Sequence, residues 1–274
     1  LLSEPNLQQQ LVEIGYQGKK LEELEGLSAT EKTKMLFIVQ DPYTSYYDAK
    51  VVRDFVALTQ KLGFSPILLP FKPNGKAMHI KGFLARFSKT AKTQAEFLNR
   101  VAKLNVPLVG VDPAIVLSYR DEYKEALGDS RGDFHVLTAH EWLTNQLESN
   151  TLQSAVKNIA KSDRTFEWHL FPHCTESAFM PNSPKEWQHI FAQFGQTLNV
   201  EKVGCCGMAG VFGHEIQNQT MSKDIYDVSW SKKLQGKDPN HCLATGYSCR
   251  SQVKRYEKAI LKHPVQALLE VLNN

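Results

Sequence analysis

The chain has 274 residues, of which 42% are hydrophobic and 22% charged, and its formal net charge is +3 at pH 7. These proportions are ordinary for a soluble globular protein. The charge is too small, and the basic residues too scattered, to indicate nucleic-acid binding. No apolar run approaches the ~18 residues of a transmembrane helix, and no signal peptide is present, so we expect a cytoplasmic protein. Because residue 1 is not methionine, we also expect a fragment of a longer chain.

The first half of the chain alternates predicted strands and helices. Residues 1–30 are polar, and we interpret them as a linker or lead-in helix. Short apolar runs then predict buried strands at residues 35–39, 66–69, 106–111 and 134–137. Helical patterns separate these runs, and this alternation is typical of a doubly wound α/β unit with right-handed crossovers.

The second half follows the same pattern. Apolar runs predict strands at residues 168–171, 200–203 and 242–246. A serine followed by proline and glutamate predicts a helix start at Ser183. We therefore expect an α/β protein with two similar doubly wound lobes, each a mostly parallel sheet flanked by helices.

Matching positions in the two halves suggest an internal duplication. Asp41 falls where Cys174 falls, residues 73–75 fall where Cys205-Cys206-Gly207 fall, and Asp112 falls near Cys249. On this basis the predicted domains are residues 31–150, without cysteines, and residues 151–274, with all of them. The alternative is that any two α/β halves share such spacing, because strand and helix lengths repeat in this fold class.

The cysteines are the strongest chemical signal in the sequence. All five follow residue 173, and two of them are adjacent at Cys205 and Cys206. Adjacent side chains in extended backbone point to opposite faces, so they do not readily pack as a core pair. Crowding of thiols without an export signal favours metal or redox chemistry over a disulfide framework. We predict a four-thiolate metal site, with no catalytic residue beside it, made of Cys174, Cys205, Cys206 and Cys249.

Other residues near these cysteines carry alternatives. Cys242 lies inside an apolar strand and is predicted to be a small buried hydrophobic residue. His173 and His214 are candidates for metal ligands or proton donors, although a histidine near a loop is more often a hydrogen-bonded surface group. Arg250 and Lys254 could offset thiolate charge, but an ordinary solvated helix face is the preferred interpretation.

Asp41, Asn74 and Asp112 occupy the corresponding positions of the first half. Carboxylates prefer hard cations, so these residues could mark an altered metal site. Asp-Pro and Pro-Asn-Gly are also common turn formers. We favour the second interpretation.

Three strings resemble a known family: residues 40–48, 203–210 and 244–252. Together with Cys174 they are similar to the cysteine-rich CCG domains of heterodisulfide reductase and of the glycolate oxidase iron–sulfur subunit. They resemble still more the C-terminal part of the YdiJ-type FAD/iron–sulfur oxidoreductases, flavoproteins of the D-2-hydroxyglutarate or D-lactate dehydrogenase kind. One departure from the family pattern is Gly246, where the family commonly has the first cysteine of a Cys-x-x-Cys pair.

The resemblance implies a function for the chain as part of a larger enzyme. It implies a C-terminal electron-transfer domain of a flavin-dependent 2-hydroxy-acid dehydrogenase, with an iron–sulfur cluster, such as a 4Fe-4S cluster, or zinc at the cysteines. FAD and a ferredoxin-type cluster would then belong to partner domains of the same polypeptide, and the fragment alone would be inactive. A homo-oligomer and peripheral membrane association through the electron acceptor stay open.

Two other functions are compatible with the sequence. The chain could be a structural or assembly domain whose cysteines hold zinc or nothing. It could instead be a thiol-based enzyme that uses Cys205 or Cys206 with a histidine base. No oxyanion-forming motif accompanies the thiols, which makes the thiol-based enzyme the weakest of the three.

Overall fold

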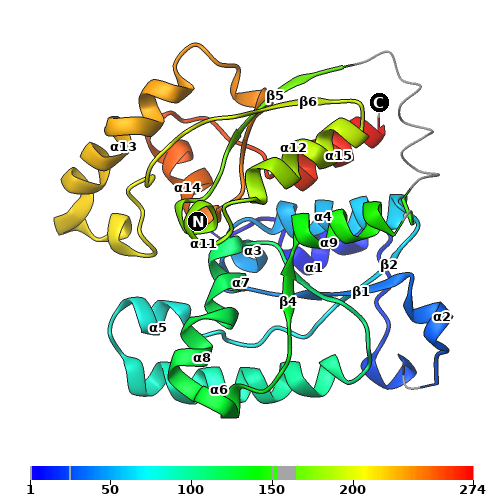
Figure 1. Cartoon of the computed structure of the whole chain (residues 1–274). Coiled ribbons are helices and arrows are strands. Elements are labelled where there is room, and N and C mark those ends of the chain that lie inside the picture. Colours follow the sequence, from blue (N-terminus) through cyan, green and yellow to red (C-terminus); the bar gives the residue numbers. More distant parts are fainter. Residues whose placement is uncertain (1, 25, 150, 153–164, 274) are drawn as a thin grey trace. The chain divides into compact units, whose positions relative to one another are not determined.

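The computed structural model describes residues 2–24, 26–149, 151–152 and 165–273. The chain divides into two compact units, Leu1–Trp142 and Leu143–Asn274, coloured blue to green and green to red in Figure 1. Each unit is a parallel sheet flanked by helices, so the predicted α/β class is confirmed. The junction predicted at residue 150 lies outside the described residues.

The first sheet has four parallel strands in the order β2-β1-β3-β4. The strands are β1 (Met35–Val39), β2 (Ser65–Leu68), β3 (Leu108–Gly110) and β4 (Val136–Thr138). Every residue of β1 is buried, as the apolar run predicts for a strand covered on both faces. Met35, Phe37 and Val39 belong to one core cluster with residues of the long helix α6 (Leu84–Ala102), because alternate side chains of a strand share one face.

Helices cover both faces of this sheet. The helices after β1 are α3 (Pro42–Tyr46), α4 (Ala49–Lys61), α5 (Lys76–Ile80), α6 (Leu84–Ala102), α7 (Pro113–Arg120), α8 (Glu122–Leu127) and α9 (Ala139–Glu148), the last of which crosses into the second unit. Figure 1 shows α4 on one side of the sheet and α6 on the other. None of the described helices of the chain is long and apolar enough to cross a membrane.

The segment before β1 packs on the first unit. It contains α1 (Leu7–Glu13) and α2 (Ala29–Lys32). Leu11 and Leu24 are buried, and the Tyr16 hydroxyl accepts a hydrogen bond of 2.8 Å from the Leu68 amide. The lead-in segment therefore contributes to the core and to the sheet edge of the first unit.

The second sheet has three parallel strands in the order β6-β5-β7. The strands are β5 (Glu167–Phe171), β6 (Thr197–Val200) and β7 (Cys242–Ala244). The helices are α11 (Cys174–Phe179), α12 (Ser183–Gln193), α13 (Gln219–Leu234), α14 (Tyr247–Tyr256) and α15 (Pro264–Asn273). The strand predicted at residues 200–203 is wrong by three positions. Only Leu198 of this edge strand is buried, so its apolar pattern is too weak to place it.

The two sheets share strand order and register. Met35 pairs with Ser65, and the residues 132 positions later, Glu167 and Thr197, pair in the same way. Phe37 pairs with Leu108, and His169 pairs with Cys242. This agreement of order and register is what an internal duplication predicts.

Candidate functional site

The four predicted cysteines follow the carboxyl ends of the three strands in the second sheet. Cys174 is the first residue of α11, after β5, and Cys249 lies in the first turn of α14, after β7. Cys205 and Cys206 lie in the loop after β6. Because parallel strands end at one edge of a sheet, three separate segments bring their thiols to the same place, the usual position of a ligand site in open α/β sheets.

The thiols interact with one another in a row. The pKa of Cys205 is lowered far below its ordinary value, first by hydrogen bonding from Cys174 and then from Cys206. The same contacts raise the pKa of Cys174 and of Cys206, and Cys206 also interacts with Cys249. The Gly207 amide donates to the Cys205 sulfur at 3.3 Å. Cys205 is therefore the position where a thiolate is favoured.

The site has an open end and a closed end. Cys174 and Cys205 are half-buried, whereas Cys206 and Cys249 are buried. The last two belong to the core cluster of the second unit, together with residues of α13 and α14. A group held by the four sulfurs would be reached by solvent from the Cys174 and Cys205 side.

The loop that carries Cys205 and Cys206 is tied to the neighbouring helices. Gly207 has φ +83°, and a Cβ at this position would lie 2.1 Å from the Ser222 carbonyl oxygen. The Ser222 hydroxyl donates to the Gly207 carbonyl at 2.7 Å. The Gln252 amide group donates to the Cys206 carbonyl at 2.9 Å and to the Ser222 hydroxyl at 2.8 Å. Sequence reasoning missed Ser222 and Gln252, because only the folded chain brings them to the loop.

His173 explains the glycine at position 246. Its Nδ1 accepts the Thr175 amide at 3.2 Å, which leaves the proton on Nε2, 3.2 Å from the Ser248 hydroxyl. A Cβ on Gly246 would lie 2.3 Å from the His173 ring. The imidazole therefore occupies the space of a side chain at position 246, and both of its nitrogens have partners within the protein.

His214 and Cys242 lie in different surroundings. Burial, followed by the charge of Arg255, lowers the pKa of His214. Cys242 is fully buried in β7, and burial raises its pKa to about 11. Cys242 is thus the small buried residue that the sequence predicts.

The prediction that Arg250 and Lys254 lie on a solvated helix face is wrong for Arg250 and confirmed for Lys254. Arg250 is 5% exposed, and its guanidinium donates to the carbonyls of Ala244 and Thr245 at 2.8 and 3.0 Å. These carbonyls lie at the carboxyl end of β7 and hold the guanidinium inward, away from the helix surface. Lys254 is exposed.

A buried carboxyl group joins two of the cysteine-bearing segments. Glu176, in α11, is 1% exposed and accepts hydrogen bonds from the hydroxyls of Ser183 and Thr245. The Thr245 hydroxyl also accepts the His173 amide at 2.9 Å. This network fixes the start of α11 to the end of β7, and the sequence contains no local signal for it.

In the first unit the matching strand ends carry helix caps. Asp41 accepts the amides of Tyr43 and Thr44 at 2.8 and 2.9 Å and caps α3. Asp112 accepts the Ala114 and Ile115 amides and caps α7. The turn-forming interpretation of these residues is confirmed.

The alignment of the halves needs a small correction. The caps of α3 and α11 are Asp41 and His173, so Asp41 matches His173 rather than Cys174. The caps of α7 and α14 are Asp112 and Gly246, so Asp112 does not match Cys249. Cap positions follow backbone geometry, and sequence spacing alone could not locate them to one residue.

The donor set fits a soft metal centre better than a hard one. Thiolates are the preferred ligands of iron–sulfur clusters and zinc. Within the described ranges, no group of three or more histidine, cysteine or acidic side chains already has the arrangement of a metal site. The sulfurs are gathered at one edge, and binding would require their side chains to turn toward a common centre.

Comparisons with known proteins identify what this chain is similar to. It is 82% identical to the D-2-hydroxyglutarate dehydrogenase of Haemophilus influenzae and 56% identical to that of Escherichia coli, over 272 residues in both cases. These matches cover 99% of this chain and 26% of each relative. The chain is homologous to one part of a longer oxidoreductase.

A more distant relative matches a larger share of its own length. This relative is one of the subunits of the anaerobic glycerol-3-phosphate dehydrogenase of Escherichia coli. It is 22% identical over 235 residues, which are 84% of this chain and 57% of that protein. No protein-family model matches the chain. The oxidoreductase part of the resemblance is therefore confirmed, and the cysteine-rich domain type stays a prediction.

Proposed function

We propose that this chain is the C-terminal electron-transfer part of a flavin-dependent D-2-hydroxyglutarate dehydrogenase. In this proposal Cys174, Cys205, Cys206 and Cys249 hold an iron–sulfur cluster. The observation that carries it is the gathering of four thiols at one sheet edge, in a chain 82% identical to part of a D-2-hydroxyglutarate dehydrogenase. FAD and a ferredoxin-type cluster belong, in this proposal, to other domains of the polypeptide.

The number of electrons released by the dehydrogenase reaction is consistent with a one-electron carrier in this chain. Oxidation of a 2-hydroxy acid to a 2-oxo acid releases two electrons and two protons, and a flavin can take them as a hydride and a proton. A centre held by the four cysteines supplies one-electron transfer from the reduced flavin toward an acceptor. The chain itself then needs only to hold, insulate and tune that centre.

The described residues suit each of these tasks. The burial of Cys206 and Cys249 keeps water from one side of the centre. The backbone at Gly207 approaches the sulfurs closely, and its amide donates to Cys205. Hydrogen bonds to cluster sulfurs are among the features that set a reduction potential.

Rapid-mixing kinetics on the full-length protein test the proposal. In Cys206→Ser, flavin reduction by D-2-hydroxyglutarate should keep its rate, whereas turnover with cytochrome c, a bulky one-electron acceptor, should be lost. Cys242→Ser is the matched control, because Cys242 is buried outside the row of interacting thiols, and it should preserve both rates. Unchanged turnover in Cys206→Ser would support the alternative, a structural or assembly domain.

A further inference from the structure

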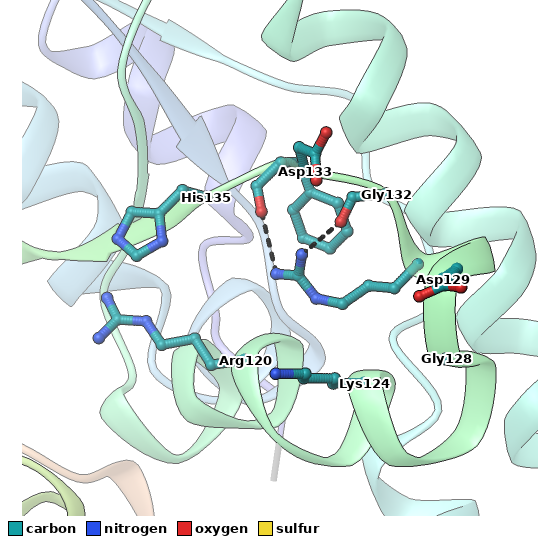
Figure 2. Close-up of a pocket in the computed structure, with 9 residues that line it drawn as sticks. Arg120, Lys124, Gly128, Asp129, Gly132, Asp133 and His135 are labelled. Atoms are coloured by element: carbon teal, nitrogen blue, oxygen red, sulfur yellow. Dashed lines mark hydrogen bonds between the residues drawn. The ribbon is translucent and has the colours of Figure 1, made fainter.

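The first unit contains a pocket of ≈ 580 Å³ that is remote in sequence from the cysteines. It lies where α7, α8 and the loop before β4 meet (Figure 2). Ligand pockets commonly have volumes of about 300–1,000 Å³. The lining residues include Arg120, Lys124, Arg131 and His135 on the basic side, and Asp129 and Asp133 on the acidic side.

The wall of this pocket is held in place by side chains that bind backbone. The Arg131 guanidinium donates to the carbonyls of Tyr119, Gly132 and Phe134 at 2.8, 2.7 and 2.9 Å. It also lies over the Phe134 ring, 4.0 Å from the centroid. These contacts give the loop one defined shape, and a pocket with fixed walls orders little when it binds a ligand.

Asn99 secures the same loop from α6. Its amide nitrogen donates to the Arg131 carbonyl at 2.7 Å, and its oxygen accepts the Phe134 amide at 3.2 Å. Gly132 has φ +72°, and a Cβ there would lie 2.4 Å from the Asn99 amide group. The conformation of this loop therefore requires glycine at position 132, because Asn99 fills the space that a side chain there would need.

Three basic side chains lie along one side of this pocket. Figure 2 shows the His135 ring next to the Arg120 guanidinium, with the Lys124 side chain extending toward Arg120. In the same view the Asp133 carboxylate is directed away from these nitrogen atoms. The Arg120 guanidinium is held in place by an ion pair with Glu141. It also donates a hydrogen bond of 2.8 Å to the Val136 carbonyl. Lys124 is exposed and forms no ion pair with any described residue.

Burial and the neighbouring charges both change the pKa of His135. Burial lowers the pKa of its imidazole, the charges of Arg120 and Arg131 lower it further, and Glu141 acts in the opposite direction. Burial also lowers the pKa of Arg131, which Asp133 raises and Arg120 lowers. The positive charges of Arg120 and Arg131 therefore act on His135, while Glu141 pairs with Arg120 and two aspartates line the same pocket.

We propose that this pocket binds a small oxyanion with two negative charges, either a dicarboxylate or a phosphate group. Lys124 supplies a mobile charge, and the guanidinium of Arg120, which lies next to His135 (Figure 2), supplies a fixed one. Ammonium and guanidinium groups both bind carboxylate and phosphate oxygens. The inference rests on the first unit alone and does not depend on what the cysteines hold.

Calorimetric titration of the 274-residue chain at low salt tests this proposal, with succinate and inorganic phosphate as the probes. Saturable binding of either probe should weaken roughly tenfold in Lys124→Gln, because a charge-assisted contact is lost. Lys92→Gln is the matched control, since Lys92 is an exposed lysine of α6 outside the pocket, and it should bind as the wild type does. Binding of succinate alone or of phosphate alone would identify the kind of oxyanion.

A second measurement separates specific binding from general attraction to a basic protein. A bound anion offsets the charges of Arg120 and Arg131, so nuclear magnetic resonance should show the pKa of His135 rising when the probe saturates. The proposal would be overturned if neither probe bound saturably, or if the wild type and Lys124→Gln bound the probes with equal affinity. It would also be overturned if the pKa of His135 did not change on binding.

Discussion

The two units place different chemistry on the same strand ends. Their sheets agree in strand order and register, yet the first unit ends its strands in Asp41 and Asp112, and the second carries thiols there. The aspartates cap α3 and α7. In the second unit the caps are His173 and Gly246, and the cysteines follow them within the helices. One scaffold can therefore end its strands in capping carboxylates or gather thiols at the same edge.

The largest effect is expected at the glycine that both units share. Gly207 and Gly75 have φ +83° and +79°, but their added Cβ atoms would meet backbone at 2.1 Å and the Phe87 side chain at 2.9 Å, respectively. Gly207→Ala should cost roughly 3 kcal/mol and Gly75→Ala roughly 1–2 kcal/mol. Urea unfolding measures both. Equal losses would show that the contact with Ser222 does not constrain the cysteine loop.

The next effect concerns the space shared by His173 and Gly246. Gly246→Cys should destabilise the second unit by roughly 2 kcal/mol, because the new Cβ overlaps the imidazole. Combining Gly246→Cys with His173→Ala should remove the overlap. The free energy of unfolding of the double variant should then exceed the value expected from the two single variants by a coupling energy of roughly 1 kcal/mol or more. A double-mutant cycle by urea unfolding measures it, and strictly additive effects would contradict the overlap.

A pH effect distinguishes the first unit. Burial, and then the charge of Asp112, raises the pKa of Asp41 to about 7. The folded chain therefore binds this proton more tightly than the unfolded chain, so stability should fall as the pH rises from about 4 to about 7. Asp112→Asn keeps an oxygen that can accept the Ala114 amide and removes the repulsion. It should stabilise the protein at pH 8 by on the order of 1 kcal/mol.

Thermal unfolding between pH 5 and pH 8 measures this effect. The gain from Asp112→Asn should be larger at pH 8 than at pH 5, since Asp41 is protonated in the folded chain at the lower pH. A gain that does not change with pH would mean that the two carboxyl groups do not repel each other.

The smallest effect is expected at Cys242. Cys242→Ala removes a sulfur that packs in the core of the second unit and should cost about 1 kcal/mol. Metal and sulfide contents should not change. Loss of metal from this variant would make Cys242 a ligand and would require a different set of cysteines.

The sequence predicts features that depend on local pattern. The apolar run of β1 locates a strand buried on both faces, and cysteine spacing selects the four thiols that the fold gathers. The position of the edge strand β6 could not be predicted in this way, because Leu198 is its one buried residue and leaves no apolar run. The domain boundaries and the ligand role of the cysteines stay predictions.

Features that depend on contacts between distant segments could not be predicted. The inward position of Arg250 depends on carbonyls at the carboxyl end of β7. The fit of His173 against Gly246 joins residues 73 positions apart. Such pairs have no local signature, because each residue type is ordinary at its own position.

Iron, zinc and acid-labile sulfide analysis of the anaerobically purified 274-residue chain tests directly whether the four cysteines hold an iron–sulfur cluster. Iron and sulfide should be present in equal amounts, and Cys206→Ser should lose both. Zinc without sulfide, or four free thiols with no metal in a folded chain, would contradict an electron-transfer role for the cysteine site.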